Sequence, residues 1–382
     1  MKGIIIGGGI GGLTAAIALR QRGISVTVYE AAPELKSVGA GIIMATNAMI
    51  VLQRLGLAEK IQSNGYELND VQIADANWRT IQKINSQYAI MKYGLGSFAI
   101  HRAALQQILF EELPEEDVIM NHRVEHVSQN KDKVRVKFAN GNEAEADFII
   151  GADGIKSVVR QSLFGNTKYR YSGQTCWRAT VDTAIPKRLE KSSHELWGSK
   201  AGLRLGIVPL NLTQLYLYAT VCSPAGGKDD LTTSKKNLIQ QFSEFDNQCI
   251  QLLEDANLNK IIRTDIYDFA PIKKWYKGRI ALIGDAAHAT TPNLGQGGCQ
   301  AIEDAYVIAQ SLARHQQPEK AFEVFQSIRY AKVKYVVDTS WRLGKLTNLS
   351  SPLLIKIRNA TIRLIPSYAN KKIADTLYQL NY

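Results

Sequence analysis

A glycine-rich turn close to the start of the chain limits the possible fold more than any other feature of the sequence. An apolar run at residues 3–6 reads as a short buried strand, and residues 13–20 carry apolar side chains at helical period. Between them lie Gly7, Gly9 and Gly12 at GxGxxG spacing. Such glycines let the backbone turn sharply and approach a pyrophosphate, while the N–H groups at the helix start point toward that anion. The segment predicts a dinucleotide-binding strand, turn and helix.

An acidic residue follows at the place that this interpretation requires. Residues 25–29 read as the next strand, which ends at Glu30, eighteen residues past Gly12. A carboxylate there can accept hydrogen bonds from a ribose diol. The alternative is a structural glycine turn with an exposed glutamate, but the complete order of strand, turn, helix, strand and acid favours a Rossmann-like domain.

The composition is that of an ordinary globular protein. With 382 residues, 45% hydrophobic and 21% charged, the chain can form two or three units around a large core. Its apolar N-terminal stretch contains the glycine turn itself, so removal as a signal peptide would destroy the predicted strand, and we expect a cytoplasmic protein. Cys176, Cys222, Cys249 and Cys299 have no metal-ligand spacing. We expect free, buried thiols and no metal site.

The net charge of +11 is concentrated near the C-terminus, where residues 320–382 contain eleven Lys and Arg against three Asp and Glu. Such a region could meet a membrane or a nucleic acid. A solvated face of C-terminal helices is favoured, because the sequence has no contiguous basic run and no nucleic-acid motif. No apolar run is long enough to span a bilayer. We therefore expect neither a nucleic-acid partner nor stable membrane insertion, and the oligomeric state stays open.

Two segments read as alternating strands outside the nucleotide-binding fold, and residues 238–253 read as one helix across them. The predicted fold is α/β, with a Rossmann-like domain, an inserted and mostly antiparallel β-sheet domain, and a helical C-terminus. The predicted division is a discontinuous nucleotide-binding domain at residues 1–70, 96–175 and 268–340, a substrate domain at residues 71–95 and 176–267, and a C-terminal helical segment at residues 341–382.

Two further motifs lie at the ends of predicted buried strands. Asp153 follows the first of these strands, and the next helix carries Ser157 and Arg160. The second strand ends at Asp285, and the glycine-rich residues 292–298 then lead into a long helix. A glycine-rich helix start allows a polar group to bind the exposed N–H groups.

The order and spacing of these three motifs resemble the single-component FAD-dependent aromatic hydroxylases, the flavoprotein monooxygenases that include para-hydroxybenzoate, salicylate and urate hydroxylases. The resemblance covers roughly residues 1–340, and three matched motifs are far more specific than one. It implies an FAD site formed by Gly7, Gly9, Gly11, Gly12, Glu30, Ala31, Arg102, Val124, Asp153, Asp285, Gly295, Gln296, Gly297 and Gly298. For Arg102 an ordinary surface role stays open, and the motif residue His288 is expected to pack or cap rather than to act as a base.

The resemblance also implies the chemistry. In that family NAD(P)H reduces FAD, O₂ adds to the reduced flavin, and a C4a-hydroperoxyflavin transfers one oxygen atom to an electron-rich substrate. We therefore expect a monooxygenase that hydroxylates or epoxidises a planar small molecule, such as an aromatic acid or a purine like urate. Because the cofactor carries the difficult step, the protein needs no nucleophile–base pair of its own.

Substrate contacts are expected from the second sheet, whose predicted strands carry Arg178, Arg204 and Tyr216. An arginine with a phenol could bind an anionic planar substrate and polarise a ring O–H or N–H bond. Urate hydroxylases of the family use an Arg and a Tyr in this sheet, so Arg204 and Tyr216 are the expected catalytic residues. All three could instead be ordinary sheet residues, and that alternative stays open.

Several related functions are less compatible with the sequence. The WxWxIP segment of flavin-dependent halogenases is absent, as is the second GxGxxG of Baeyer-Villiger monooxygenases. A flavin-dependent reductase of the same fold and a non-catalytic flavin-binding redox sensor remain open. Oxygen uptake would exclude the reductase, and NAD(P)H oxidation stimulated by substrate would exclude the sensor.

Overall fold

The computed structural model describes residues 1–35, 40–229, 234–256 and 261–382. Its first layer is a six-stranded sheet in the order β18-β19-β12-β1-β2-β8, parallel except for the β18–β19 pair. Helices cover its faces, which explains why the central strands are short, continuous apolar runs. The strands are β1 (Lys2–Ile6), β2 (Ser25–Tyr29), β8 (Val118–Ile119), β12 (Phe148–Gly151), β18 (Tyr276–Lys277) and β19 (Ile280–Leu282).

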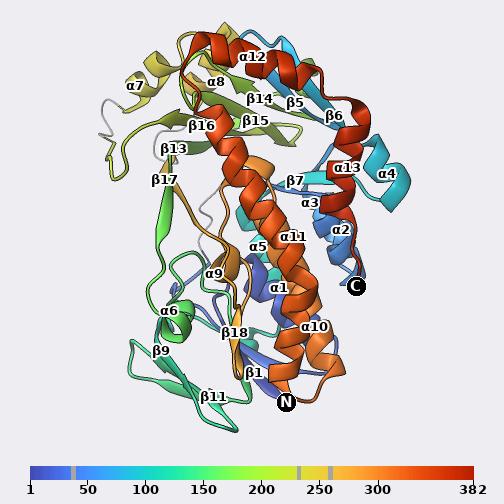
Figure 1. Cartoon of the computed structure of the whole chain (residues 1–382), viewed down its shortest axis with the longest axis vertical. Helices are drawn as coiled ribbons and strands as arrows, with labels where there is room; N and C mark the ends of the chain where they lie inside the picture. The colour runs from blue at the N-terminus through green and yellow to red at the C-terminus, as the bar shows by residue number, and fades with distance from the viewer. Residues whose placement is uncertain (36–39, 230–233, 257–260) are drawn as a thin grey trace.

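Three helices form the centre of this first domain. The helix of the glycine motif, α1 (Ile10–Arg20), packs against α10 (Gly297–Arg314), and α10 packs against the long helix α11 (Pro318–Thr347). Figure 1 shows α11 running along the molecule beside α10. The smaller helices are α2 (Thr46–Arg54), α3 (Ala58–Asn64), α5 (Arg102–Glu111), α6 (Val158–Phe164) and α9 (Asp285–His288).

Two three-stranded antiparallel sheets flank the first domain. One joins β3 (Gly41–Met44), β7 (Ser97–His101) and β4 (Tyr66–Leu68) and lies toward the second domain. The other joins β9 (Val124–Gln129), β10 (Val134–Phe138) and β11 (Glu143–Ala146) and lies at the end of the molecule that is lowest in Figure 1.

The second domain is built on a seven-stranded sheet in the order β17-β13-β16-β15-β14-β5-β6. All neighbours are antiparallel except β14 and β5, so the expected mostly antiparallel second sheet is confirmed. The predicted domain boundaries themselves stay a prediction. The strands are β5 (Asp70–Asp75), β6 (Thr80–Asn85), β13 (Tyr169–Asp182), β14 (Ser192–Trp197), β15 (Arg204–Asn211), β16 (Gln214–Cys222) and β17 (Ile262–Phe269), and α4 (Gln87–Tyr93) follows β6.

The prediction of one helix over residues 238–253 was wrong, because the chain forms α7 (Ser234–Gln241) and α8 (Asn247–Asp255). The break lies at Asp246, whose carboxylate accepts a hydrogen bond from the Gln248 N–H at 3.0 Å and caps α8. An N-terminal cap of this kind starts a new helix rather than continuing an old one. Both helices cover the outer face of the seven-stranded sheet (Figure 1).

The C-terminal region is helical, as expected, with α12 (Pro352–Arg363) and α13 (Ser367–Tyr378). In Figure 1, α12 crosses the upper end of the second domain and α13 descends beside α4. A search of the described helices found none with the length and apolar character to cross a bilayer.

All four cysteines are free, but the expectation that all are buried was wrong for Cys222. Cys222 is the last residue of β16, where the strand leaves the sheet and its side chain becomes exposed.

Candidate cofactor and active site

Each of the three glycines of the GxGxxG motif is required for a different structural reason. A Cβ on Gly12 would lie 2.0 Å from the Gly7 carbonyl oxygen, and one on Gly7 would lie 2.5 Å from the Ala152 oxygen. Gly7 also has a φ of +109°, which side-chain-bearing residues rarely adopt. Gly9 differs, because a Cβ there would meet nothing within 4 Å. The open space at Gly9 adjoins the N-terminus of α1, where the first N–H groups have no partner within the helix, and it fits a bound diphosphate.

The end of β2 lies directly beside this turn. The Glu30 carboxylate accepts hydrogen bonds from the Gly8 N–H at 2.6 Å and from the Ala32 N–H at 2.8 Å. Ala31 lies in the bend between Glu30 and Ala32 and is half-buried. Gln106 of α5, which the sequence did not single out, donates to the Gly8 oxygen at 2.7 Å.

The predicted adenine contact lies on an adjoining segment. His122 N–H donates to the Glu30 carbonyl at 2.7 Å, and two residues later Val124 begins β9 with its side chain buried. The residues expected to hold the adenosine half are therefore brought together by β2 and the start of β9.

The second motif caps a helix. Asp153 accepts hydrogen bonds from the Ser157 hydroxyl at 2.6 Å and from the Val159 N–H at 3.1 Å, at the start of α6. Burial raises the pKa of Asp153, and these hydrogen bonds oppose that rise. Arg160 is fully buried and donates to the Ala286 oxygen at 2.8 Å. Arg160 thus ties the second motif to α9.

The third motif places charges where the domains meet. Asp285 begins α9 and is exposed. The protein around its carboxyl removes water from one side of the group, which raises the pKa of Asp285. The His288, Arg102 and Arg160 side chains oppose this rise. Arg102, exposed at the start of α5, also acts on Tyr216 of the second domain. Arg102 therefore acts electrostatically on both Asp285 and Tyr216, which belong to different elements.

The glycine-rich loop before α10 is held from behind by amides. Gln296 is buried, and its Oε1 accepts from the Asn47 amide at 3.0 Å and from the Gln300 amide at 2.9 Å. Gly295 has a φ of +62°, which suits glycine. Gly297 and Gly298 are the first residues of α10, so their N–H groups begin a helix. These features fit a flat, hydrogen-bonding ligand laid along the loop.

A buried charge network supports this loop from the other side, and no motif of the sequence indicated it. Arg329 of α11 donates to Asp304 at 2.8 Å and also bonds Glu303, and all three side chains are almost fully buried. His288 bonds Asp304, and the Tyr382 hydroxyl donates to Glu303 at 2.9 Å. His288 is thus a buried hydrogen-bonded residue of α9. Two adjacent acids in an apolar helical pattern were the available sequence signal.

The three residues predicted to bind substrate share one face of the seven-stranded sheet. Arg178 pairs with Tyr218 across β13 and β16, whereas Arg204 pairs with Thr220 across β15 and β16, and alternate residues of a strand point the same way. A Cβ on Gly41 of β3 would lie 2.6 Å from the Tyr216 ring. This inner face therefore packs toward the first domain.

Arg204 is held by protein partners. Its guanidinium lies 3.3 Å from Glu195 and donates to Gln174 at 2.9 Å and to Asn293 at 3.0 Å. Only 4% of Arg204 is exposed. Asn293 precedes the glycine loop, so Arg204 links the inner face to that loop.

Glu195 is a further residue of this site that the sequence did not indicate. Burial alone would raise its pKa, but Arg204 and the Tyr218 hydroxyl, which donates at 2.6 Å, hold the pKa of Glu195 below its usual value. Glu195 is therefore a carboxylate at neutral pH, and its charge offsets that of Arg204. The period-two pattern of β14 was the only sequence signal for Glu195.

Tyr216 lies near Arg178 on the inner face, and the Arg178 guanidinium donates a hydrogen bond to Thr264. Burial raises the pKa of Tyr216 well above its usual value, in spite of the opposing charge of Arg178. The phenol therefore keeps its proton at neutral pH. Tyr216 can donate a hydrogen bond to a ligand, but it is a poor base.

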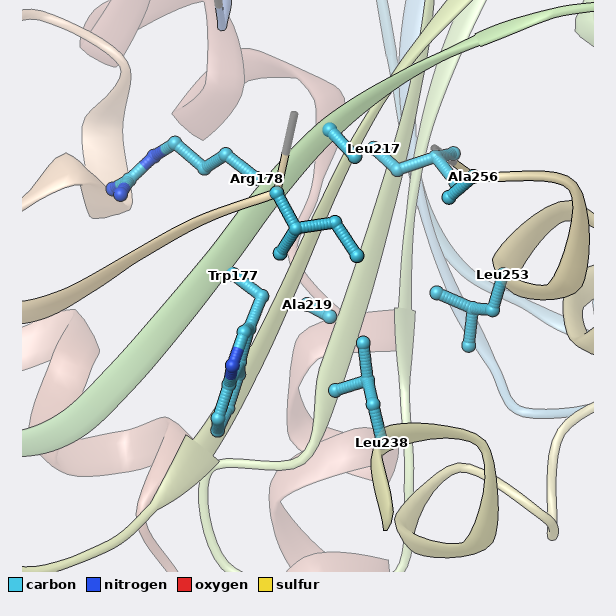
Figure 2. A pocket seen from close by; sticks show the side chains of 9 residues that line it. Trp177, Arg178, Leu217, Ala219, Leu238, Leu253 and Ala256 are labelled. Carbon is cyan, nitrogen blue, oxygen red and sulfur yellow. The ribbon is translucent and has the colours of Figure 1, made fainter. Parts of the chain in front are cut away.

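A small apolar pocket lies on the opposite, outer face of the same sheet. Figure 2 shows Trp177, Leu217, Leu238 and Leu253 around it, while the guanidinium of Arg178 points away from these side chains. The pocket lies between the strands β13 and β16 and the helices α7 and α8. It is therefore on the opposite side of the sheet from Tyr216.

Comparison with known proteins agrees with this geometry. The family described as FAD binding domain matches residues 1–340. The chain is 36% identical to an aurachin C monooxygenase/isomerase of Stigmatella aurantiaca, covering 95% of this chain and 94% of that protein. It is 30% identical to a 2-heptyl-3-hydroxy-4(1H)-quinolone synthase of Pseudomonas aeruginosa, covering 99% and 98%.

A solved structure is similar over the same length. HpxO of Klebsiella pneumoniae, complexed with FAD and uric acid, matches with a TM-score of 0.92 and 28% identity, covering 99% of this chain and 96% of that one. The nucleotide motifs, the second sheet and the helical C-terminus are thus parts of one known architecture. The chain belongs to the FAD-binding domain family and is an FAD-dependent monooxygenase that uses NAD(P)H.

Proposed function

We propose that the enzyme oxygenates a neutral, planar, electron-rich N-heteroaromatic compound that carries an apolar side chain. The observation that carries this proposal is the pairing of Arg204 with Glu195, because it offsets the charge that would attract an anionic substrate. Ile73 and Val71 face the same side of the sheet in register with β14 and add apolar surface. The similarity to the quinolone synthase over nearly the whole chain supports this substrate class.

Urate is the second candidate. Arg204 and Tyr216 lie on one face, and the urate-bound HpxO structure is similar over 99% of this chain. A purine anion would need the Arg204 charge, whereas Glu195 already neutralises it. Comparing a neutral quinolone with urate therefore separates the two candidates.

We propose the following cofactor site. The N-terminus of α1 with Gly7, Gly9, Gly11 and Gly12 would hold the diphosphate, and Glu30, Ala31 and Val124 the adenosine half. Arg102, Asp153, Asp285 and residues 295–298 would hold the remainder. Bound FAD supplies electron transfer from NAD(P)H and the activation of O₂. The protein binds and orients the substrate and excludes water, and Tyr216 donates a hydrogen bond to it.

The test is oxygen uptake by the purified enzyme with NADH or NADPH. We expect 2-heptyl-4(1H)-quinolone to stimulate NAD(P)H oxidation, with one oxygen atom added to the product by mass spectrometry. Stimulation by urate alone would favour the second candidate. Oxidation without oxygen uptake would indicate a reductase.

We also propose a cytoplasmic location, because NAD(P)H is available there.

Asp285→Ala should yield a folded protein with little bound FAD. The carboxyl lies at the end of a buried strand, among the positive charges of Arg102 and Arg160, where it would bind hydroxyl groups of the cofactor. The measurement is the ratio of flavin absorbance to protein absorbance. Asp338→Ala on the exposed side of α11 is the control, and full flavin content in Asp285→Ala would contradict the assignment.

Arg204→Gln should uncouple NAD(P)H oxidation from oxygenation, because it loosens Glu195, Gln174 and Asn293 together. The loss of one charge-assisted hydrogen bond costs about 1.5–3 kcal/mol, roughly ten- to more than a hundredfold in kcat/KM. Hydrogen peroxide production per NAD(P)H measures the uncoupling.

Tyr216→Phe keeps the packing of the ring and should lower kcat more than it raises KM. Wild-type coupling and kinetics in both variants would place the substrate elsewhere.

A further inference from the structure

The outward side of α12 is apolar, which is unusual for a surface helix. Leu353, Leu354, Ile357 and Leu364 are 66%, 47%, 52% and 81% exposed. At 3.6 residues per turn these four positions fall on one side of the helix. The other side carries Arg358, which is buried and lies 4.3 Å above the Trp197 ring. The helix thus contacts the protein with one side and presents an apolar side to solvent.

The exposed apolar surface continues into the next segment. Ile365, Tyr368 and Ile373 are 37%, 72% and 40% exposed, in the connection from α12 to α13 and in α13 itself. Figure 1 shows these two helices along the outer edge of the second domain. Exposed apolar side chains therefore follow one another along the chain from α12 into α13.

Basic side chains accompany this surface. Residues 341–382 contain seven Lys and Arg and one acid, Asp375. On α12, Lys356 and Arg363 are exposed and lie two turns apart along one edge of the apolar side. Lys371 and Lys372 are exposed at α13. Asp375 bonds Lys92, Tyr88 and Tyr93 of α4, so it anchors α13 to the protein.

We propose that α12 and its connection to α13 dock on an anionic lipid bilayer and lie in its interface without crossing it. An interfacial helix has an apolar side flanked by Lys and Arg, and anionic headgroups attract those charges. The alternative partner is a second copy of the chain, but lysines are depleted from protein interfaces. This inference does not depend on the identity of the substrate. It gives a function to the basic C-terminal region, for which a solvated face was the favoured interpretation.

The test is flotation of the holoenzyme with vesicles of phosphatidylcholine, with and without phosphatidylglycerol. We expect binding to the anionic vesicles only, weakened by salt. Lys356→Glu combined with Arg363→Glu should weaken binding about tenfold or more. The matched control is Lys131→Glu with Lys137→Glu, on the sheet at the opposite end of the molecule (Figure 1). The control should bind as the wild type does.

A second pair of variants tests the apolar side. Leu353→Ser with Ile357→Ser should also lose vesicle binding. The control is Leu212→Ser, because Leu212 lies in the turn between β15 and β16, is 74% exposed, and should not affect vesicle binding. NAD(P)H oxidation without vesicles should be unchanged in all of them. The proposal is overturned if the wild type does not float with anionic vesicles at low salt, or if both C-terminal variants bind like the wild type. A dimer that dissociates in Leu353→Ser with Ile357→Ser would assign this surface to a second copy instead.

Discussion

Gly9→Val is expected to give a folded protein that contains no FAD. A Cβ at Gly9 meets no protein atom within 4 Å, and the backbone there has a φ of −75°, which valine readily adopts. The added methyl groups would occupy the space beside the first turn of α1 where the diphosphate would lie. We expect FAD affinity to fall by more than about a hundredfold, or about 2.8 kcal/mol. Flavin absorbance of the purified protein and titration with FAD measure the change.

The matched control is a glycine of the same motif with a different environment. A Cβ on Gly12 would lie 2.0 Å from the Gly7 oxygen, so Gly12→Val should lower the yield of folded protein itself. The far-ultraviolet circular dichroism of Gly9→Val should match that of the wild type. If Gly9→Val retains its yellow colour, the diphosphate does not lie at this turn.

Arg329→Met should lower the free energy of unfolding by about 3–5 kcal/mol, because it removes the buried cation that bonds both Glu303 and Asp304. Glu303 and Asp304 are both fully buried, and Arg329 bonds both. Lys332 lies 2.9 Å from Glu303 and stays with that acid in the variant, whereas Asp304 keeps its hydrogen bonds with His288 and the Gly284 N–H. Urea unfolding followed by circular dichroism measures the loss. Lys334→Met removes an exposed ion pair on the same helix and should cost less than about 1 kcal/mol.

The loss should also depend on pH. Burial would raise the pKa of Asp304, but the His288 and Arg329 side chains that bond it hold that pKa below its usual value. A lowered carboxyl pKa stabilises the folded state above the ordinary pKa of about 3.9, and that stabilisation disappears as the pH falls through the lowered value. The difference between the wild type and Arg329→Met should therefore be full at neutral pH and shrink in acid. A difference that does not change with pH would show that lost packing, rather than charge, causes it.

Local patterns of the sequence were sufficient for the nucleotide-binding part of the fold. The glycine turn and Glu30 lie within thirty residues of one another, so their local conformation depends mainly on residues that are close in the sequence. Helix α10 and the strands β5, β6, β13, β15 and β16 of the second sheet also followed from periodicity, whereas β14, β17 and β18 were not predicted. The break between α7 and α8 was missed because the Asp246 cap interrupts an apolar pattern that is otherwise continuous.

The sequence by itself determined the alternation of side chains within each strand of the second sheet, as well as the turn that can hold a diphosphate. The register between β15 and β16, which the tertiary structure supplies, places Arg204 and Tyr216 on one face. Only the tertiary structure decided that Glu195 neutralises Arg204 and that Arg329 lies against Asp304. A strand period states which side chains share a face, but not which partners meet them there. Those partners come from other strands and helices, and burial makes their pairing obligatory, because an unpaired charge removed from water costs several kcal/mol.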